Sequence, residues 1–182
     1  MPQEITRTQT EKYTVYTGPT AESFSPTMAG ITYPDPAYEI LVYRRPLCVF
    51  EYVLSGRGHI ERNGSILTVN AGDAYILTAG TYHHYYSDKV DPWTKIWFNV
   101  SGSLVQHLLS DYGLDGVTLI PRFHNETPLT RILDALPPTL YTLLTSWLYC
   151  SINIFRSWRI FWQTKFPSIL LHWRSAIISI CT

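Results

Sequence analysis

Residues 48–77 read CVFEYVLSGRGHIERNGSILTVNAGDAYIL, in which short β-branched and aromatic runs alternate with turn residues. The dipeptide Asn63-Gly64 separates HIER from SILTV, and Asn-Ala-Gly-Asp at 70–73 precedes the next run. Asn-Gly is the clearest hairpin signal here, because a type I′ turn needs positive φ at both central residues. The stretch therefore predicts consecutive antiparallel strands joined by tight turns.

Similar runs continue on both sides of this stretch. YEILVY begins at residue 38, HHYY occupies 83–86 and TKIWFNV occupies 94–100, with no helical pattern between them. Many short strands without an intervening helix predict a mainly β fold, a barrel or sandwich over residues 38–102. Residues 1–37 mix Thr, Pro and Gly with single aromatics, which indicates an N-terminal arm and the first strands.

Helical spacing appears only after the strands, over residues 103–136. The first apolar stripe includes Leu104, Leu108 and Leu109, and a second helix is predicted from Thr127. The second stripe contains Leu129, Ile132 and Leu133. Pro137-Pro138 cuts this second helix short, because proline removes a helical hydrogen-bond donor and clashes with the preceding turn. One or two helices therefore follow the strands.

The tail, residues 137–182, has a different composition from the rest of the chain. It holds four of the six tryptophans and four basic residues, but no acidic residue and no glycine. Three interpretations stay open: translation out of frame or a gene remnant, a buried or pairing extension, and a membrane-active segment. Residues 135–155 carry no charge, but their prolines and polar residues disfavour membrane insertion.

Composition limits the classes of function. The 182 residues carry 14 Lys+Arg and 14 Asp+Glu, so the charge excess of a nucleic-acid-binding protein is missing. Three cysteines are too few and too scattered for a disulfide framework. The N-terminal sequence is polar and lacks the apolar core of a secretory signal. We therefore expect a cytoplasmic protein that does not depend on a membrane.

Residues 72–83, GDAYILTAGTYH, resemble the second motif of the cupin barrels, G(X)5PXG(X)2H, with Thr78 in place of proline. A barrel of that size has a mouth that can hold one small ligand. Most cupin enzymes hold a metal there through an HXH(X)3–4E motif, and the one histidine upstream, His59, is not part of such a motif. We therefore expect no metal, no cofactor and no enzymatic activity.

His83 and His84 are adjacent on a predicted strand, so their side chains point to opposite faces. Only one of them can face the barrel interior. For that residue, ligand binding and a core histidine bonded to a backbone carbonyl are both open.

The ordered set Arg45-Pro46, SGRGHI, NAGDAYIL, His-His-Tyr and DPW followed by WFNVSG resembles the effector-binding and dimerisation domain of AraC-family transcription regulators, over roughly residues 15–136. The resemblance implies a cupin-like barrel, or jelly roll, that binds a small molecule, commonly a sugar. It also implies helices that pair two subunits into a homodimer. In the arabinose-responsive member, an N-terminal arm closes over the sugar.

The resemblance also implies a ligand site. Arg45, Tyr85 and Trp97 match ligand-contacting positions, and Lys95 falls where the arabinose-responsive member has a histidine. A guanidinium can bond neighbouring hydroxyls and an indole can stack on the apolar face of a sugar ring. Lys95 and Trp97 are two apart on one strand and so share a face. His83 is the fifth candidate for ligand binding. Two of the candidates have another possible role: Trp97 in core packing and Arg45 in a surface salt bridge.

Family members continue into two helix-turn-helix units, and no basic recognition helix follows Pro138 here. We therefore expect a sugar-sensing and dimerisation module of an AraC-type regulator that lacks its own DNA-binding domain and does not contact nucleic acid directly. The sequence predicts Leu104, Leu108, Leu109, Leu129, Ile132 and Leu133 as the dimerisation residues. Two alternatives remain, a stand-alone cupin enzyme acting on a sugar and a membrane-associated cupin sensor.

Overall fold

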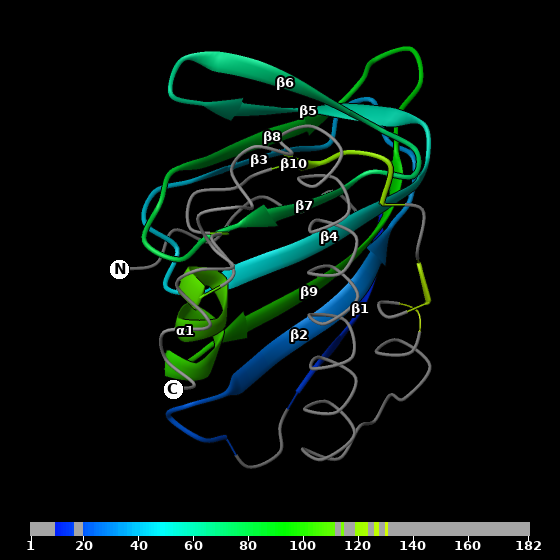
Figure 1. The fold of residues 1–182 in the computed structure, drawn as a ribbon. Helices are drawn as coiled ribbons and strands as arrows, with labels where there is room; N and C mark the ends of the chain where they lie inside the picture. The colour runs from blue at the N-terminus through cyan, green and yellow to red at the C-terminus, as the bar shows by residue number, and fades with distance from the viewer. Residues whose placement is uncertain are drawn as a thin grey trace.

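The computed structural model describes residues 10–16, 20–111, 114, 119–123, 126–127 and 130. This part of the chain forms strands with one helix among them (Figure 1). The strands are β1 (Glu11–Val15), β2 (Ser25–Thr32), β3 (Glu39–Val42), β4 (Cys48–Ser55), β5 (Arg57–Arg62), β6 (Ser65–Asn70), β7 (Ala74–Leu77), β8 (His83–Ser87), β9 (Thr94–Ser101) and β10 (Leu119–Ile120), and the helix is α1 (Ser103–Asp111).

Two antiparallel sheets face each other (Figure 1). The larger has the order β1-β2-β9-β4-β7-β10, and the smaller has the order β3-β8-β5-β6. The chain crosses between the sheets on either side of β3, from β4 to β5, from β6 to β7, and again on either side of β8. This alternation is the jelly-roll pattern, so the predicted mainly β, cupin-like fold is confirmed.

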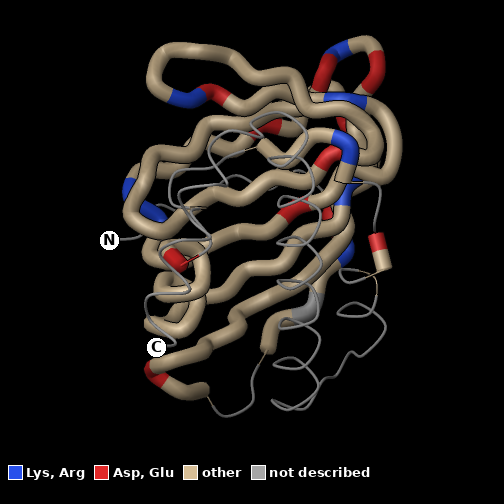
Figure 2. Tube along the Cα trace, viewed as in Figure 1, with Lys and Arg blue, Asp and Glu red and all other residues tan. Residues whose placement is uncertain are grey.

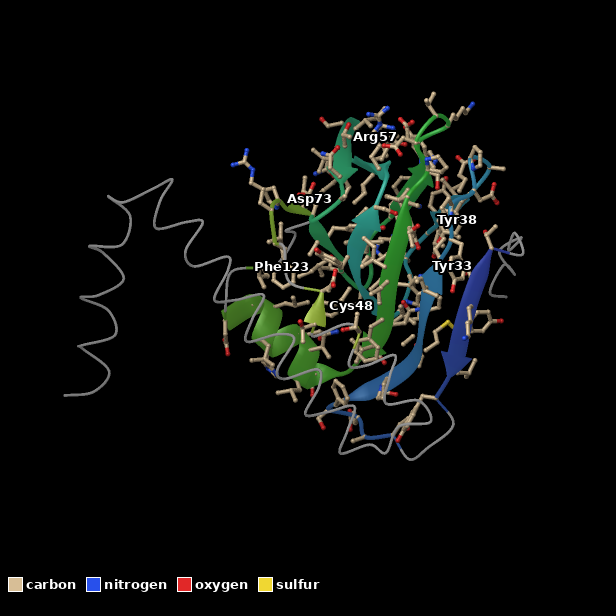
Figure 3. All side chains as sticks on the ribbon, turned by 90° about the vertical axis from the view of Figure 1, so that its right-hand side faces the viewer. Tyr33, Tyr38, Cys48, Arg57, Asp73 and Phe123 are labelled. Carbon is tan, nitrogen blue, oxygen red and sulfur yellow. The ribbon has the colours of Figure 1, made fainter. Side chains whose placement is uncertain are left out.

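The central strands of the six-stranded sheet are buried on both faces. Between the sheets lie Val49, Tyr75 and Trp97, whereas Phe50 and Phe98 point the other way, toward α1 and the segment after it. Figure 3 shows Cys48 and Phe123 on the helix side and Tyr38 on the opposite side. Double burial explains why β4, β7 and β9 are nearly continuous apolar runs.

The four-stranded sheet has one solvent-facing side. In β8, His83, Tyr85 and Ser87 are buried while His84 and Tyr86 are only half-buried, which is the alternation expected of such a sheet. Figure 2 shows acidic and basic residues intermixed over the described part of the chain, without a patch of one sign.

Most of the predicted elements form where the sequence placed them. Asn63 and Gly64 have φ values of 50° and 75°, which is the type I′ hairpin turn. The first predicted helix is α1. At Thr130 the backbone N–H donates to the carbonyl of Glu126 at 3.0 Å, which is one helical turn at the predicted start of the second helix.

The sheet begins earlier than the predicted barrel at 38–102. β1 and β2 lie within residues 1–37, and β2 pairs with β9 from Ser25 opposite Ser101 to Thr32 opposite Lys95. The first strands are therefore part of the barrel wall. Leu129, Ile132, Leu133 and the tail, 137–182, lie outside the described residues.

Helix α1 covers the outer face of the six-stranded sheet. Leu109 is 3% exposed and packs there beside Val105, with Leu104 and Leu108 partly buried against the same core. The three predicted dimerisation leucines of this helix thus contribute to the core. Within the described residues, no helix has the length and apolar character that crossing a membrane requires.

Gly58 in β5 lets an indole cross the space between the sheets. A Cβ at Gly58 would lie 2.1 Å from Cε3 of Trp93, whose side chain is fully buried. Gly64 in the hairpin turn has no atom within 4 Å of such a Cβ, but its φ is 75°. Close packing therefore requires glycine at position 58, whereas the positive φ favours glycine at position 64.

We predict that Gly58→Ala lowers the free energy of unfolding by about 3 kcal/mol, because the added methyl group must displace Trp93. Gly64→Ala is the matched control and costs about 1 kcal/mol, since it strains only the turn. Urea denaturation measures both values. Equal losses for the two variants would contradict the close packing of Trp93 on β5.

On the outer face of the four-stranded sheet, His84 joins three strands. Its Nδ1 lies 2.6 Å from a Glu61 oxygen in β5, and its Nε2 lies 2.7 Å from a Glu39 oxygen in β3. Burial lowers the pKa of His84, but the bonds to Glu61 and Glu39 outweigh burial and raise the pKa above its ordinary value. The imidazolium form therefore stabilises the folded state.

A raised folded-state pKa gives a stabilisation that is complete below the unfolded pKa and is lost as pH rises through the folded value. We predict that the contribution of His84 to the free energy of unfolding falls by up to about 1 kcal/mol between about pH 6 and about pH 8.5, the range of partly exposed ion pairs. The stability difference between the unsubstituted chain and His84→Gln should therefore be smaller at the higher pH. Urea denaturation of the unsubstituted chain and of the His84→Gln variant at both pH values measures this difference in free energy of unfolding. His107→Gln, on the exposed side of α1, should behave like the unsubstituted chain.

Candidate functional site

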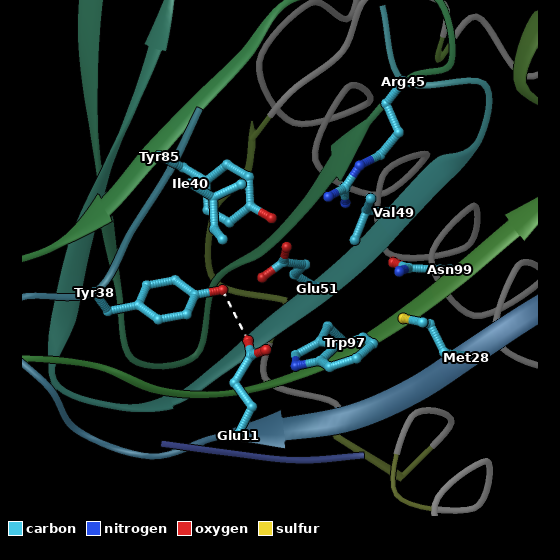
Figure 4. A pocket seen from close by; sticks show the side chains of 10 residues that line it. All are labelled: Glu11, Met28, Tyr38, Ile40, Arg45, Val49, Glu51, Tyr85, Trp97 and Asn99. Atoms are coloured by element: carbon cyan, nitrogen blue, oxygen red, sulfur yellow. Dashed lines mark hydrogen bonds between the residues drawn. The ribbon is translucent and has the colours of Figure 1, made fainter. Parts of the chain in front are cut away.

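A cavity opens between the two sheets, near their β1 and β3 edges (Figure 4). It encloses about 370 Å³ of empty space when its mouth is included, but the centres of water-sized molecules can occupy only about 40 Å³. That space holds roughly three water molecules. The lining residues are Glu11, Met28, Tyr38, Ile40, Arg45, Val49, Glu51, Tyr85, Trp97 and Asn99.

The floor of the cavity carries a buried ion pair. Lys95 in β9 donates from Nζ to Oε2 of Glu51 in β4, and the two residues are 0% and 2% exposed. Tyr75 in β7 donates its hydroxyl to the same Oε2 at 2.5 Å. Burial lowers the pKa of Lys95, while the Glu51 carboxylate beside it favours the charged form. The three side chains tie together three neighbouring strands.

Aromatic rings surround the ammonium group of Lys95. Its Nζ lies 4.4 Å from the ring centre of Tyr85, 4.8 Å from that of Trp93 and 4.9 Å from that of Tyr38. At these distances the negative ring faces attract a cation. This cage keeps a desolvated charge inside the fold, so Lys95 supports Glu51 from below and does not itself line the cavity.

Trp97 forms an apolar wall of the cavity, held by a chain of hydrogen bonds. Its Nε1 donates to Oγ1 of Thr32 at 3.1 Å, and Thr32 donates to Oε1 of Glu11 at 2.9 Å. Tyr38 donates to the same Glu11 oxygen at 2.9 Å (Figure 4). Since the indole N–H is already satisfied inside the protein, the ring face is what Trp97 offers to a ligand. Glu11 links β1 to the four-stranded sheet across the mouth.

Arg45, in the connection after β3, points into the cavity beside Tyr85 (Figure 4). Burial and the nearby Glu51 raise the pKa of Tyr85, although Arg45 acts in the opposite direction. Burial also raises the pKa of Tyr38. Both phenols are therefore neutral and able to donate or accept hydrogen bonds, and Arg45 brings a forked donor to the same space.

The two adjacent histidines of β8 point to opposite faces of the sheet. His83 is the buried one and faces inward. Its Nε2 lies 2.9 Å from the carbonyl oxygen of Thr78 and 2.9 Å from Oγ1 of Thr81. Burial lowers its pKa. This is the carbonyl-bonded arrangement that the sequence left open, and His83 lies outside the residues that line the cavity.

The structure thus brings Arg45, Tyr85 and Trp97 together around one cavity, with Lys95 beneath it and His83 beyond its lining. Sequence reasoning missed two acidic residues, Glu11 and Glu51, together with Tyr38 and Asn99. Asn99 could have been found, because it follows Trp97 by two residues and so shares its face. Glu51 lies directly opposite Trp97 on the neighbouring strand, and the sequence does not disclose that pairing.

Among the described residues, no three His, Cys, Asp or Glu side chains gather in a way that could hold a metal ion. The polar groups that line the cavity are one guanidinium, which donates, two carboxylates, which accept, and phenols and an amide, which do both. These groups can hold a polar organic molecule through several directional hydrogen bonds, with one aromatic face beside them.

Solved structures of low sequence identity resemble the chain in outline. The protein YhaK from Escherichia coli is 14% identical over 52% of this chain and 45% of its own, with a TM-score of 0.43. The Cnp3 cupin domain of Schizosaccharomyces pombe is 14% identical over 58% of this chain and 73% of its own, with a TM-score of 0.41. With TM-scores this low, these likenesses assign no function.

Sequence comparison is more informative. The Msm operon regulatory protein of Streptococcus mutans is 32% identical over 66 residues, which are 36% of this chain and 24% of that protein. The chain therefore spans about a quarter of the length of this relative. The profile of the AraC-like ligand binding domain matches residues 26–140, which contain all but one of the residues that line the cavity. With well over half of its length matched, the chain belongs to the family of AraC-like ligand binding domains.

Proposed function

We propose that this chain is the effector-sensing module of an AraC-type transcription regulator and that its effector is a sugar bound between the two sheets. The observation that carries this proposal is the cavity in which Trp97 offers a ring face while Arg45 and Glu51 offer a donor and an acceptor. A sugar presents an apolar ring face and hydroxyl groups that both donate and accept. That combination matches the lining group by group.

Entry of a sugar requires the mouth of the cavity to open, because the free space holds only a few water molecules. Glu11 is the residue that bridges the mouth, through Tyr38 and Thr32. An effector that replaces or extends these bonds favours one arrangement of β1 over another. Sensing then follows as a population shift between the two arrangements.

The remaining parts of the proposal follow from the family and the sequence. The module works in the cytoplasm, pairs with a second copy through its helical region, and has no enzymatic role. The effector-binding barrel itself does not contact an operator. Sedimentation equilibrium tests the homodimer, and gel retardation with DNA tests the last statement.

The direct test of the proposed function is a thermal-shift screen of the purified chain with neutral pentoses, hexoses and disaccharides. A rise in the unfolding temperature with sugar concentration is expected for at least one of them. Absence of any shift across the panel would remove sugars as the effector class. Metal analysis of the same sample tests the enzyme alternative, which a stoichiometric metal ion would favour.

We predict that Trp97→Ala weakens binding of the sugar identified in that screen at least tenfold, or about 1.4 kcal/mol, because the stacking face is lost. Trp97→Phe keeps an aromatic face and should lose less. Titration calorimetry measures both, and circular dichroism confirms that each variant is folded. Unchanged affinity in a folded Trp97→Ala variant would place Trp97 in the core only.

A further inference from the structure

The polar groups of the cavity are divided between its two walls. Glu11, Glu51 and Asn99 belong to the six-stranded sheet, on the same wall as Trp97 (Figure 4). Arg45 and Tyr85 stand on the other wall, beside the four-stranded sheet. One wall is therefore rich in hydrogen-bond acceptors, and the other carries the guanidinium donor.

The three polar residues of the first wall all carry side-chain acceptor atoms. Lys95 and Tyr75 both donate to Oε2 of Glu51. Thr32 and Tyr38 both donate to Oε1 of Glu11. Asn99 is 6% exposed, and its Oδ1 is buried with no partner among the described atoms.

A buried acceptor without a partner is costly, and native proteins satisfy such atoms with a ligand or an ordered water. The unpaired Oδ1 of Asn99 lies in the same cavity lining as the carboxylates of Glu51 and Glu11 and the ring face of Trp97. This set of groups suits a molecule that presents several donors next to an apolar surface. Hydroxyl groups on a sugar ring meet this requirement. The same ring supplies oxygen acceptors to Arg45 on the opposite wall.

The charges around the cavity balance. Lys95 neutralises Glu51 beneath the floor, and Glu11 at the mouth has the sign opposite to that of Arg45. A charged group on the ligand would therefore bring an uncompensated charge into a largely buried space, where such a charge is expensive. This balance of charges around the cavity favours a ligand without a net charge.

We propose that Glu51, Glu11 and Asn99 form an acceptor wall that determines specificity, and that it selects uncharged sugars over their carboxylated, phosphorylated or amino derivatives. This inference rests on the proposed function, since it concerns the same cavity. It assigns ligand contacts to three residues that lie outside the set predicted from the sequence. Lys95 acts as a positioning residue, because it fixes the charge and orientation of Glu51 without lining the cavity.

The test uses matched sugars that differ in charge alone as far as chemistry permits. The full chain is titrated by calorimetry with D-galactose, D-galacturonate, D-galactosamine and D-galactose 6-phosphate, and with the corresponding D-glucose set. We expect the neutral member of the preferred set to bind at least tenfold more tightly than each charged member. A charged member that binds as tightly as its neutral counterpart would overturn the acceptor wall and leave the sugar-sensing proposal intact.

Variants then assign the effect to residues. Asn99→Leu removes one acceptor without stranding a charge, and it should weaken binding of the neutral sugar at least tenfold. Glu51→Gln leaves the positive charge of Lys95 unbalanced, so the ratio of galacturonate to galactose affinity should rise at least tenfold. Lys95→Met leaves Glu51 unbalanced and should shift the ratio toward galactosamine. Glu22→Gln, an exposed carboxylate-to-amide change, is the matched control.

The outcomes separate the two proposals. If Asn99→Leu binds the neutral sugar as the unsubstituted chain does, the acceptor wall is wrong even where the charge variants fail to fold. If no member of either set binds the unsubstituted chain and the neutral panel also gives no thermal shift, the sugar-sensing function fails and this inference fails with it.

Discussion

The buried pair of Lys95 and Glu51 is the interaction on which the interior of this domain depends. Taking two charges out of water costs several kcal/mol per ion, and removing one partner of such a pair typically costs about 3–5 kcal/mol. The side chains around the pair lower the free-energy cost of burying its two charges. Tyr75 supplies a hydrogen bond to the carboxylate, and aromatic rings surround the ammonium. Gly58 leaves the room that Trp93 needs to complete that cage.

The same pair links the fold to the site. Glu51 stands directly opposite Trp97, and Lys95 stands opposite Val53, so the ion pair crosses β4 and β9 on the diagonal. Two neighbouring strands are thereby held in the register that places the carboxylate beside the indole face. Well-packed apolar side chains could stabilise that register equally well. The charged pair therefore makes sense as the support of a polar cavity.

How much could be predicted from the sequence depended on the range of each interaction. Local features were predictable: the Asn63-Gly64 turn, the alternation of His83 and His84, and the shared face of Lys95 and Trp97. Pairings between distant residues were not, because a strand pattern does not name its partner. Glu51 and Lys95 are 44 residues apart, so the sequence does not disclose their ion pair, and Glu51 is absent from the predicted site residues. Glu11 escaped notice for the same reason, since the first strands carry weak patterns and bond to residues far along the chain.

The site is assembled from chain segments that are individually unremarkable, and its chemistry arises only from their convergence. Glu11 and Thr32 come from the first two strands, Arg45 from a connection, and Trp97 from β9. Each acidic group in the cavity accepts two hydrogen bonds from the protein through one of its oxygens. Two of the rings that surround Lys95, those of Tyr38 and Tyr85, also line the cavity. Because Glu51, Tyr38 and Tyr85 belong both to the surroundings of Lys95 and to the cavity lining, a ligand bound in the cavity would be coupled to the stability of the domain.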